Sequence, residues 1–201
     1  MPPDLSATQL CLYLEESSIP IFFRLLQQGF GVKVQTGRSV KSFLCDQIGL
    51  DPEYVVNRIK ALFLDGKPVD DINSATIRDG STLAISAALP GLAGRVLRTG
   101  GRFASMRSTI SHRERTASER PKEGVVSMKL FNLLLKEMGP TFLKNGVWIE
   151  GKDLEDLIKR QPDDFWAGCK KASLDGKEVD LKGLSGLKWK DREVFLQLRT
   201  D

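Results

Sequence analysis

Histidine and cysteine, two residue types that carry much catalytic and metal chemistry, are scarce in this chain. Its 201 residues include one histidine, His112, and three widely separated cysteines, Cys11, Cys45 and Cys169. The cysteines form no Cys-x-x-Cys pair and have no histidine beside them, which argues against a disulfide framework or a zinc site. We therefore expect no metal and no cofactor, and a reducing, cytoplasmic location.

Longer signatures are missing as well. The sequence has no glycine-rich phosphate loop and no serine nucleophile elbow. No stretch approaches the roughly 20 apolar residues of a membrane span. Residues 1–18 contain three acidic side chains and lack the basic start and apolar run of a signal peptide. These absences favour a non-enzymatic protein without a transmembrane segment.

An internal repeat is the strongest positive signal. Residues 61–70 (ALFLDGKPVD) match residues 171–180 (KASLDGKEVD) at six of ten positions without a gap. Upstream, residues 37–44 align with residues 151–158 in the same order. Shared order with a small change in length is typical of a duplicated domain.

Each copy shows the same predicted order of elements. Alternating apolar residues predict strands, and apolar residues at helical spacing predict one principal helix per copy. The Asp65-Gly66 and Asp175-Gly176 pairs predict tight hairpins, because a two-residue hairpin turn needs residues with a left-handed backbone conformation. The expected strands are 9–15, 31–35, 59–64 and 82–89, then 125–134, 147–149 and 194–198, with a hairpin over 172–179. The expected helices are 38–48 and 153–160, with shorter helical turns after Pro20 and over 139–143.

A helix across one face of a small mixed sheet, then a hairpin and a closing strand, is the β-grasp order. Residues 64–71 and 75–85 (ATIRDGSTLAI) resemble the second half of ubiquitin-like proteins, nearest to the sulfur carriers of thiamine and molybdopterin synthesis. The resemblance implies an α+β chain of two tandem ubiquitin-like β-grasp domains, each a small mixed sheet with a helix packed on one face. Their expected ranges are 1–90 and 124–201, joined by a basic connector over 91–123.

A sulfur carrier of this family works through a free C-terminal Gly-Gly. The chain ends in Leu-Arg-Thr-Asp, so the second copy lacks that terminus. Gly100 and Gly101 follow the first copy, but they are internal and would need cleavage after Gly101. We interpret them as turn or close-packing glycines, with a processed or vestigial carrier tail as the alternative.

The connector carries most of the basic character. Residues 91–124 contain eight Lys or Arg and three Glu, a net charge of +5. Apolar residues from Leu92 to Ile110 fall on one helical stripe, with arginines beside it. This pattern predicts a protein-binding adaptor, with binding of nucleic acid or an anionic surface as the alternative. The candidate partner-binding residues are Arg95, Arg98, Arg102, Phe103, Met106 and Arg107. We expect residues 91–110 to be ordered and residues 111–122 to be mobile.

The remaining notable residues receive structural interpretations. His112 is interpreted as a solvent-exposed connector residue and Cys45 as a buried or half-buried thiol, each with a reactive role as the alternative. Trp148 is expected in the core, whereas Trp166 and Trp189 are expected to be partly exposed. The expected core positions near the hairpins and closing strands are Leu64, Val69, Leu83, Ile85, Leu174, Val179, Leu196 and Leu198. The partner, the pathway and the oligomeric state stay open.

Overall fold

The computed structural model describes residues 7–89, 91, 97–99, 111–112 and 120–200. Helices and strands are mixed along the chain, which confirms the α+β class. The chain divides into two compact units. Unit 1 comprises Met1–Phe30 and Lys136–Asp201, and unit 2 comprises Gly31–Leu135. These units do not follow the consecutive ranges 1–90 and 124–201, because strands from both halves of the chain pair within each unit.

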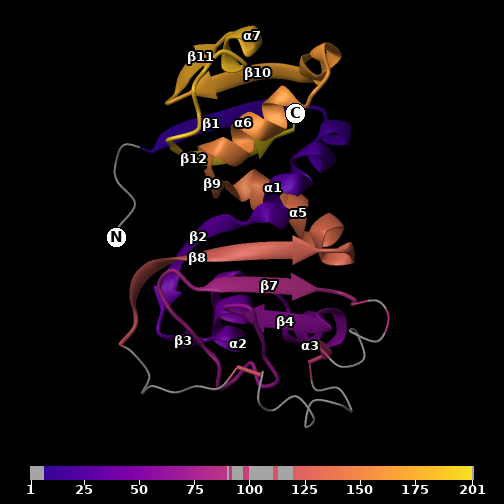
Figure 1. The fold of residues 1–201 in the computed structure, drawn as a ribbon, viewed down its shortest axis with the longest axis vertical. Helices are drawn as coiled ribbons and strands as arrows, with labels where there is room; N and C mark the ends of the chain where they lie inside the picture. The colour runs from indigo at the N-terminus through magenta and orange to yellow at the C-terminus, as the bar shows by residue number, and fades with distance from the viewer. Residues whose placement is uncertain (1–6, 90, 92–96, 100–110, 113–119, 201) are drawn as a thin grey trace. The chain divides into compact units, whose positions relative to one another are not determined.

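Unit 1 contains five strands of a mixed sheet, in the order β11-β10-β1-β12-β9 (Figure 1). β1 runs parallel to β12 and antiparallel to β10, while β9 runs antiparallel to β12. The strands are β1 (Thr8–Leu14), β9 (Val147–Glu150), β10 (Cys169–Leu174), β11 (Lys177–Val179) and β12 (Glu193–Arg199). The helices are η1 (Glu16–Phe22), α1 (Phe23–Gln28), α6 (Gly151–Lys159), η4 (Asp163–Gly168) and α7 (Leu181–Leu184).

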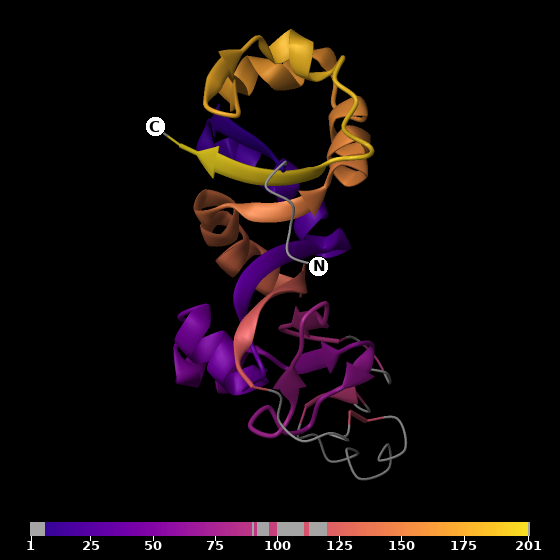
Figure 2. The ribbon, with the colours of Figure 1, turned by 90° about the vertical axis from the view of Figure 1, so that its left-hand side faces the viewer.

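The core of unit 1 lies on one face of this sheet. Leu10, Leu12 and Leu14 alternate along β1 and are each 1% exposed. They lie in the same rows as the buried Leu196 and Leu198 of β12. The helix α6 buries its apolar stripe, Leu154, Leu157 and Ile158, as its helical spacing predicts. Figures 1 and 2 show α6 beside these strands.

Unit 2 also contains a mixed sheet, in the order β2-β8-β7-β4-β5. β7 runs parallel to β8 and antiparallel to β4. Its strands are β2 (Phe30–Thr36), β4 (Ala61–Leu64), β5 (Lys67–Pro68), β7 (Thr82–Ser86) and β8 (Lys122–Phe131), with a separate two-stranded sheet of β3 (Arg38–Ser39) and β6 (Thr76–Ile77). Its helices are α2 (Val40–Ser42), the π-helical η2 (Phe43–Gln47) and α3 (Pro52–Arg58).

Helix starts in unit 2 follow from capping residues. The Ser39 hydroxyl accepts the backbone N–H of Ser42 at 3.2 Å and so caps the start of α2. The Asp51 carboxylate accepts the N–H of Glu53 at 2.7 Å, and Pro52 occupies the first turn of α3. The sequence analysis missed α3, although this Asp-Pro pair was a readable start signal.

The helix α5 (Leu133–Asn145) corrects the expected short turn over 139–143. The preceding strand ends at Phe131 instead of residue 134, because Asn132 adopts a left-handed φ of 56°. Its side-chain amide donates to the Ser86 hydroxyl and to the Ala88 carbonyl, at 2.7 and 2.6 Å. These bonds turn the chain into α5, which continues through Pro140.

The two Asp-Gly turns have the same geometry. Asp65 and Asp175 both have φ of 50°. The Asp65 carboxylate accepts the N–H of Thr82 in β7 at 2.7 Å, and the Asp175 carboxylate accepts the N–H of Gln9 in β1 at 2.8 Å. In each case the aspartate N–H donates back to the carbonyl of the same residue. β1 therefore occupies in unit 1 the place that β7 occupies in unit 2.

Burial separates the expected core positions into two groups. Six of them, Leu64, Val69, Leu83, Ile85, Leu196 and Leu198, are at most 2% exposed, which confirms them as core. Leu174 and Val179 are only half-buried. The two tryptophan assignments for Trp148 and Trp189 were wrong: Trp148 is half-buried and Trp189 is 1% exposed. The Trp189 indole N–H donates to the Leu184 carbonyl at 3.1 Å, which satisfies its polar atom in the core.

Candidate functional site

Of the predicted partner-binding residues in the connector, the structure describes only Arg98. Arg98 is exposed, and its neighbour Thr99 donates a backbone hydrogen bond of 3.0 Å to the Lys60 carbonyl of unit 2. The other predicted residues lie outside the described part of the chain: Arg95, Arg102, Phe103, Met106, Arg107, Gly100 and Gly101. The expected order of residues 91–110 lies largely outside it as well.

His112 is held against unit 2, which corrects its interpretation as a solvent-exposed residue. Its backbone N–H donates to the Pro68 carbonyl of β5 at 2.8 Å, and the residue is half-buried. The adjacent Ser111 hydroxyl donates to the Asp70 carboxylate at 2.8 Å. The expected mobility of residues 111–122 stays a prediction, although these two hydrogen bonds place Ser111 and His112 beside β5.

The cysteines show no sign of an activated thiolate. All three are free, with Cys11 and Cys45 half-buried and Cys169 buried. Burial, and then the negative charge of Asp46, raises the pKa of the Cys45 thiol. Burial also raises the pKa of Cys169. A raised pKa keeps a thiol protonated and weakly nucleophilic, so the half-buried structural interpretation of Cys45 fits its surroundings.

Among the residues that the structure describes, no group of three or more His, Cys, Asp or Glu could hold a metal ion. Asp65 and Asp175, which occupy matching positions in the repeat, each serve a hairpin instead of forming a pair. Within the same described ranges, no helix is long and apolar enough to cross a membrane.

The most distinctive surface is the face of the unit 1 sheet opposite its core, which we call the open face. Its residues alternate with the buried leucines and are half-buried or exposed. Strand register places them in rows across β11, β10, β1, β12 and β9. They are Gln9, Cys11, Tyr13, Trp148, Lys171, Ser173, Glu178, Phe195, Gln197 and Arg199.

A row of polar contacts crosses the open face at Tyr13. Lys171 and Arg199 are its partners on the two neighbouring strands. The Arg199 guanidinium lies 5.8 Å from the centre of the Tyr13 ring and donates to its hydroxyl at 3.4 Å. On the other side, Lys171 forms an ion pair of 2.7 Å with Glu178 of β11. This ion pair raises the pKa of Lys171, so its ammonium stays charged.

An aromatic pair lies on the same face. The rings of Trp148 and Phe195 are 5.0 Å apart and tilted by 52°. Gly146 lies against Phe195: a Cβ there would be 2.2 Å from the ring, and its φ is 93°. The neighbouring Lys144 carbonyl accepts the Gln197 side-chain amide at 2.9 Å. The end of α5 thus fixes both Phe195 and Gln197 at the border of the open face.

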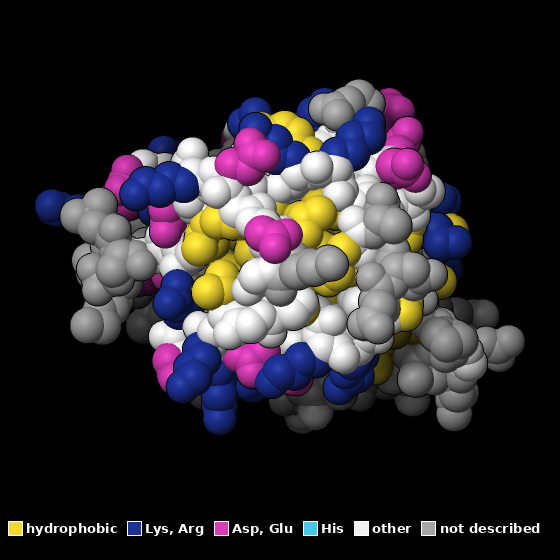
Figure 3. Space-filling model, turned by 90° about the horizontal axis from the view of Figure 1, so that it is seen from above, with side chains coloured by type: hydrophobic (Ala, Val, Ile, Leu, Met, Phe, Trp, Pro, Cys, Tyr) yellow, Lys and Arg dark blue, Asp and Glu magenta, His cyan; other side chains and the backbone are white. Residues whose placement is uncertain are grey.

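The side of unit 1 that carries β11 and α7 has a second apolar area. Figure 3 shows hydrophobic side chains gathered in the middle of this view, with acidic and basic side chains around them. β11, α7 and the segment after it include the half-buried Val179, Leu181 and Leu187.

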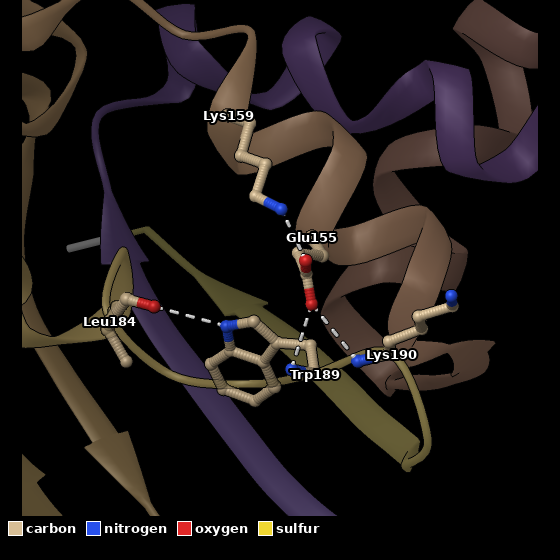
Figure 4. A network of polar contacts seen from close by, with 5 residues as sticks. All are labelled: Glu155, Lys159, Leu184, Trp189 and Lys190. Atoms are coloured by element: carbon tan, nitrogen blue, oxygen red, sulfur yellow. Dashed lines mark hydrogen bonds and ion pairs between the residues drawn. The ribbon is translucent and has the colours of Figure 1, made fainter.

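The segment before β12 is held by the carboxylate of Glu155 in α6 (Figure 4). It accepts the backbone N–H groups of Trp189 and Lys190, both at 3.1 Å, and forms an ion pair with Lys159. The Lys159 contact, followed by the Trp189 N–H, lowers the pKa of Glu155. Because these contacts within the chain already occupy the carboxylate, we assign Glu155 a structural role.

Comparison with known proteins adds no family. No protein-family model, no curated protein and no solved structure matches the chain.

Proposed function

We propose that this chain is a non-enzymatic, protein-binding adaptor, and that the open face of unit 1 is its partner-binding surface. The observation that carries the proposal is the chemistry of that face. Its aromatic and guanidinium groups contact each other in two pairs, Trp148 with Phe195 and Tyr13 with Arg199, and Phe195 also lies against Gly146. Aromatic residues and arginine are the residue types enriched in the centres of protein interfaces.

Two ubiquitin-like β-grasp units are part of the same proposal. Each unit has a parallel central pair, β1 with β12 and β7 with β8, followed by an antiparallel strand and its hairpin partner. This arrangement supports the β-grasp assignment, with strands exchanged between the two halves of the sequence. The three free cysteines support the expected cytoplasmic location.

The open face is tested by comparing matched variants in capture from native-cell extract. Tyr13→Ser combined with Arg199→Gln removes the cation–aromatic contact of the open face. Tyr54→Ser combined with Arg58→Gln makes the same chemical change on α3 of unit 2 and serves as the control. Captured partners are identified by mass spectrometry. Partners that wild type and the control capture, and that the open-face variant loses, would support the proposal.

The connector provides the competing arm of this experiment. Arg95, Arg98 and Arg102 are changed together to glutamine in the full chain. If this variant loses capture while the open-face variant retains it, the connector is the binding element and the open-face proposal is wrong. Retention of a single-stranded oligonucleotide that weakens with salt and disappears in the triple variant would favour the nucleic-acid function instead.

A further inference from the structure

β11 is the outermost strand of unit 1 among the residues that the structure describes. β10 and β11 pair as an antiparallel hairpin, with Leu174 opposite Lys177, Ser173 opposite Glu178 and Ala172 opposite Val179. In a two-residue hairpin the pair next to the turn exchanges hydrogen bonds, and the next pair does not. The N–H and the carbonyl of Glu178 therefore point away from β10, toward the outer edge of the last strand in the unit 1 order.

The equivalent edge in unit 2 shows what such an edge can bind. Pro68 of β5 matches Glu178 in the repeat and lies opposite Phe63. Its carbonyl accepts the N–H of His112 at 2.8 Å, so a segment of this chain lies against that edge. Proline has no N–H, so a second backbone bond at this position is ruled out. In unit 1 the same position is Glu178, which offers both a donor and an acceptor.

The side chains around β11 restrict what can pair there. Glu178 is exposed on the open face, with 67% of its side chain accessible. If the β11 strands of two copies paired antiparallel about this outward-facing residue, each Glu178 would lie opposite the other, and like charges opposite each other are destabilising. A basic side chain at that position would instead be attracted to the Glu178 carboxylate.

We propose that the β11 edge receives an extended segment of a partner protein as an added strand, with a basic side chain opposite Glu178. The backbone of the segment would exchange hydrogen bonds with Glu178, and its alternate apolar side chains would pack beside Val179 and Leu181. This inference rests on the proposed adaptor function and specifies how the partner is bound. Addition of a strand to an exposed sheet edge is a recurring mode of peptide recognition.

The test uses the full chain and a short peptide of alternating Thr and Val with one central Arg, with binding followed by fluorescence anisotropy. We expect the Arg peptide to bind about three- to tenfold more tightly than the same peptide with central Glu, as expected for opposite against like cross-strand charges. Glu178→Gln should remove this preference while both peptides still bind, because it keeps the backbone N–H. Glu178→Pro should weaken binding of both, because it removes the N–H donor and leaves only the carbonyl, as at Pro68.

The proline variant is expected to fold, because Pro68 occupies the same hairpin position in unit 2. Its thermal unfolding curve checks this directly. Equal binding of both peptides to wild type, no binding to wild type, or unchanged binding to a folded Glu178→Pro chain would each overturn the proposal. If partner capture depends on Tyr13 and Arg199 but not on Glu178, the adaptor function stands and only the edge mode is wrong.

Discussion

The hairpins of the two units share their turn but differ in what surrounds it. Asp65 and Asp175 have the same φ and the same reciprocal hydrogen bonds to the neighbouring strand. Across the sheet, however, Ala61, Ser86 and Phe131 in unit 2 stand where Lys171, Tyr13 and Arg199 stand in unit 1. The backbone geometry is therefore repeated, while the surface chemistry is not.

This contrast separates what the turn requires from what the sheet face allows. A tight turn needs left-handed residues and a satisfied backbone whatever its surroundings, so Asp-Gly recurs in both units. The opposite sheet face has no such requirement. Ala61 and Ser86 are nearly fully buried in unit 2, whereas Lys171 and Arg199 are exposed in unit 1. The unit 1 face is therefore the more exposed of the two at these positions, and its differences from unit 2 are the positions at which the proposed partner binding is tested.

The largest expected difference between the units is in core burial at one matched position. Leu64→Ala in unit 2 should lower the free energy of unfolding by about 2–5 kcal/mol, because Leu64 is fully buried. Leu174→Ala in unit 1 should cost about 1–2 kcal/mol, because that side chain is already half-exposed. Urea unfolding of both variants checks this, and equal losses would contradict the burial difference.

A second contrast concerns two glycines in unit 1. At Gly151 a Cβ would lie 1.9 Å from the Trp189 carbonyl oxygen, so Gly151→Ala should cost about 1–3 kcal/mol or more through displaced backbone. At Gly176 no atom lies within 4 Å, and only the φ of 79° opposes a side chain. Gly176→Ala should therefore cost about 1 kcal/mol. Thermal unfolding should rank the two variants in this order, and the reverse order would exclude the close approach at Gly151.

The turn equivalence itself is tested by removing each aspartate. Asp65→Ala and Asp175→Ala each lose a hydrogen bond from a strand N–H and place alanine at positive φ, for an expected cost of about 1–2 kcal/mol. Asn at either position keeps the acceptor and tolerates the left-handed conformation, so it should restore most of the loss. A loss confined to one unit would break the equivalence.

The smallest expected effects are acid-dependent. The Val125 N–H lowers the pKa of Asp79 in unit 2, as Lys159 and the Trp189 N–H lower that of Glu155 in unit 1. A carboxyl with a lowered folded pKa stabilises the protein above its unfolded pKa, and this contribution is lost as pH falls through the folded pKa. Asp79→Asn and Glu155→Gln should therefore be slightly destabilising at neutral pH and indistinguishable from wild type in acid. Urea midpoints at both pH values measure this, with Asp156→Asn on the exposed side of α6 as the control.

Several elements were readable from the sequence because local chemistry controls them. Ser39 caps a helix, the Asp-Gly turns form hairpins, and the α6 stripe of Leu154, Leu157 and Ile158 packs inward. The candidate site was not readable in the same way. Tyr13, Trp148 and Arg199 are far apart in sequence, and only the register of β1, β9 and β12 brings them onto one face.

What the sequence determined by itself is therefore the repeat, the turns, the alternation of the strands and the α+β class. The tertiary structure decided which strands pair. Alternation shows which side of a strand is apolar but not which neighbour covers it, so β1 could have paired within the first copy or, as found, between β10 and β12. The tertiary structure also placed Trp189 in the core and Trp148 on the open face. Strand partners and burial depend on long-range packing, and no local pattern encodes them.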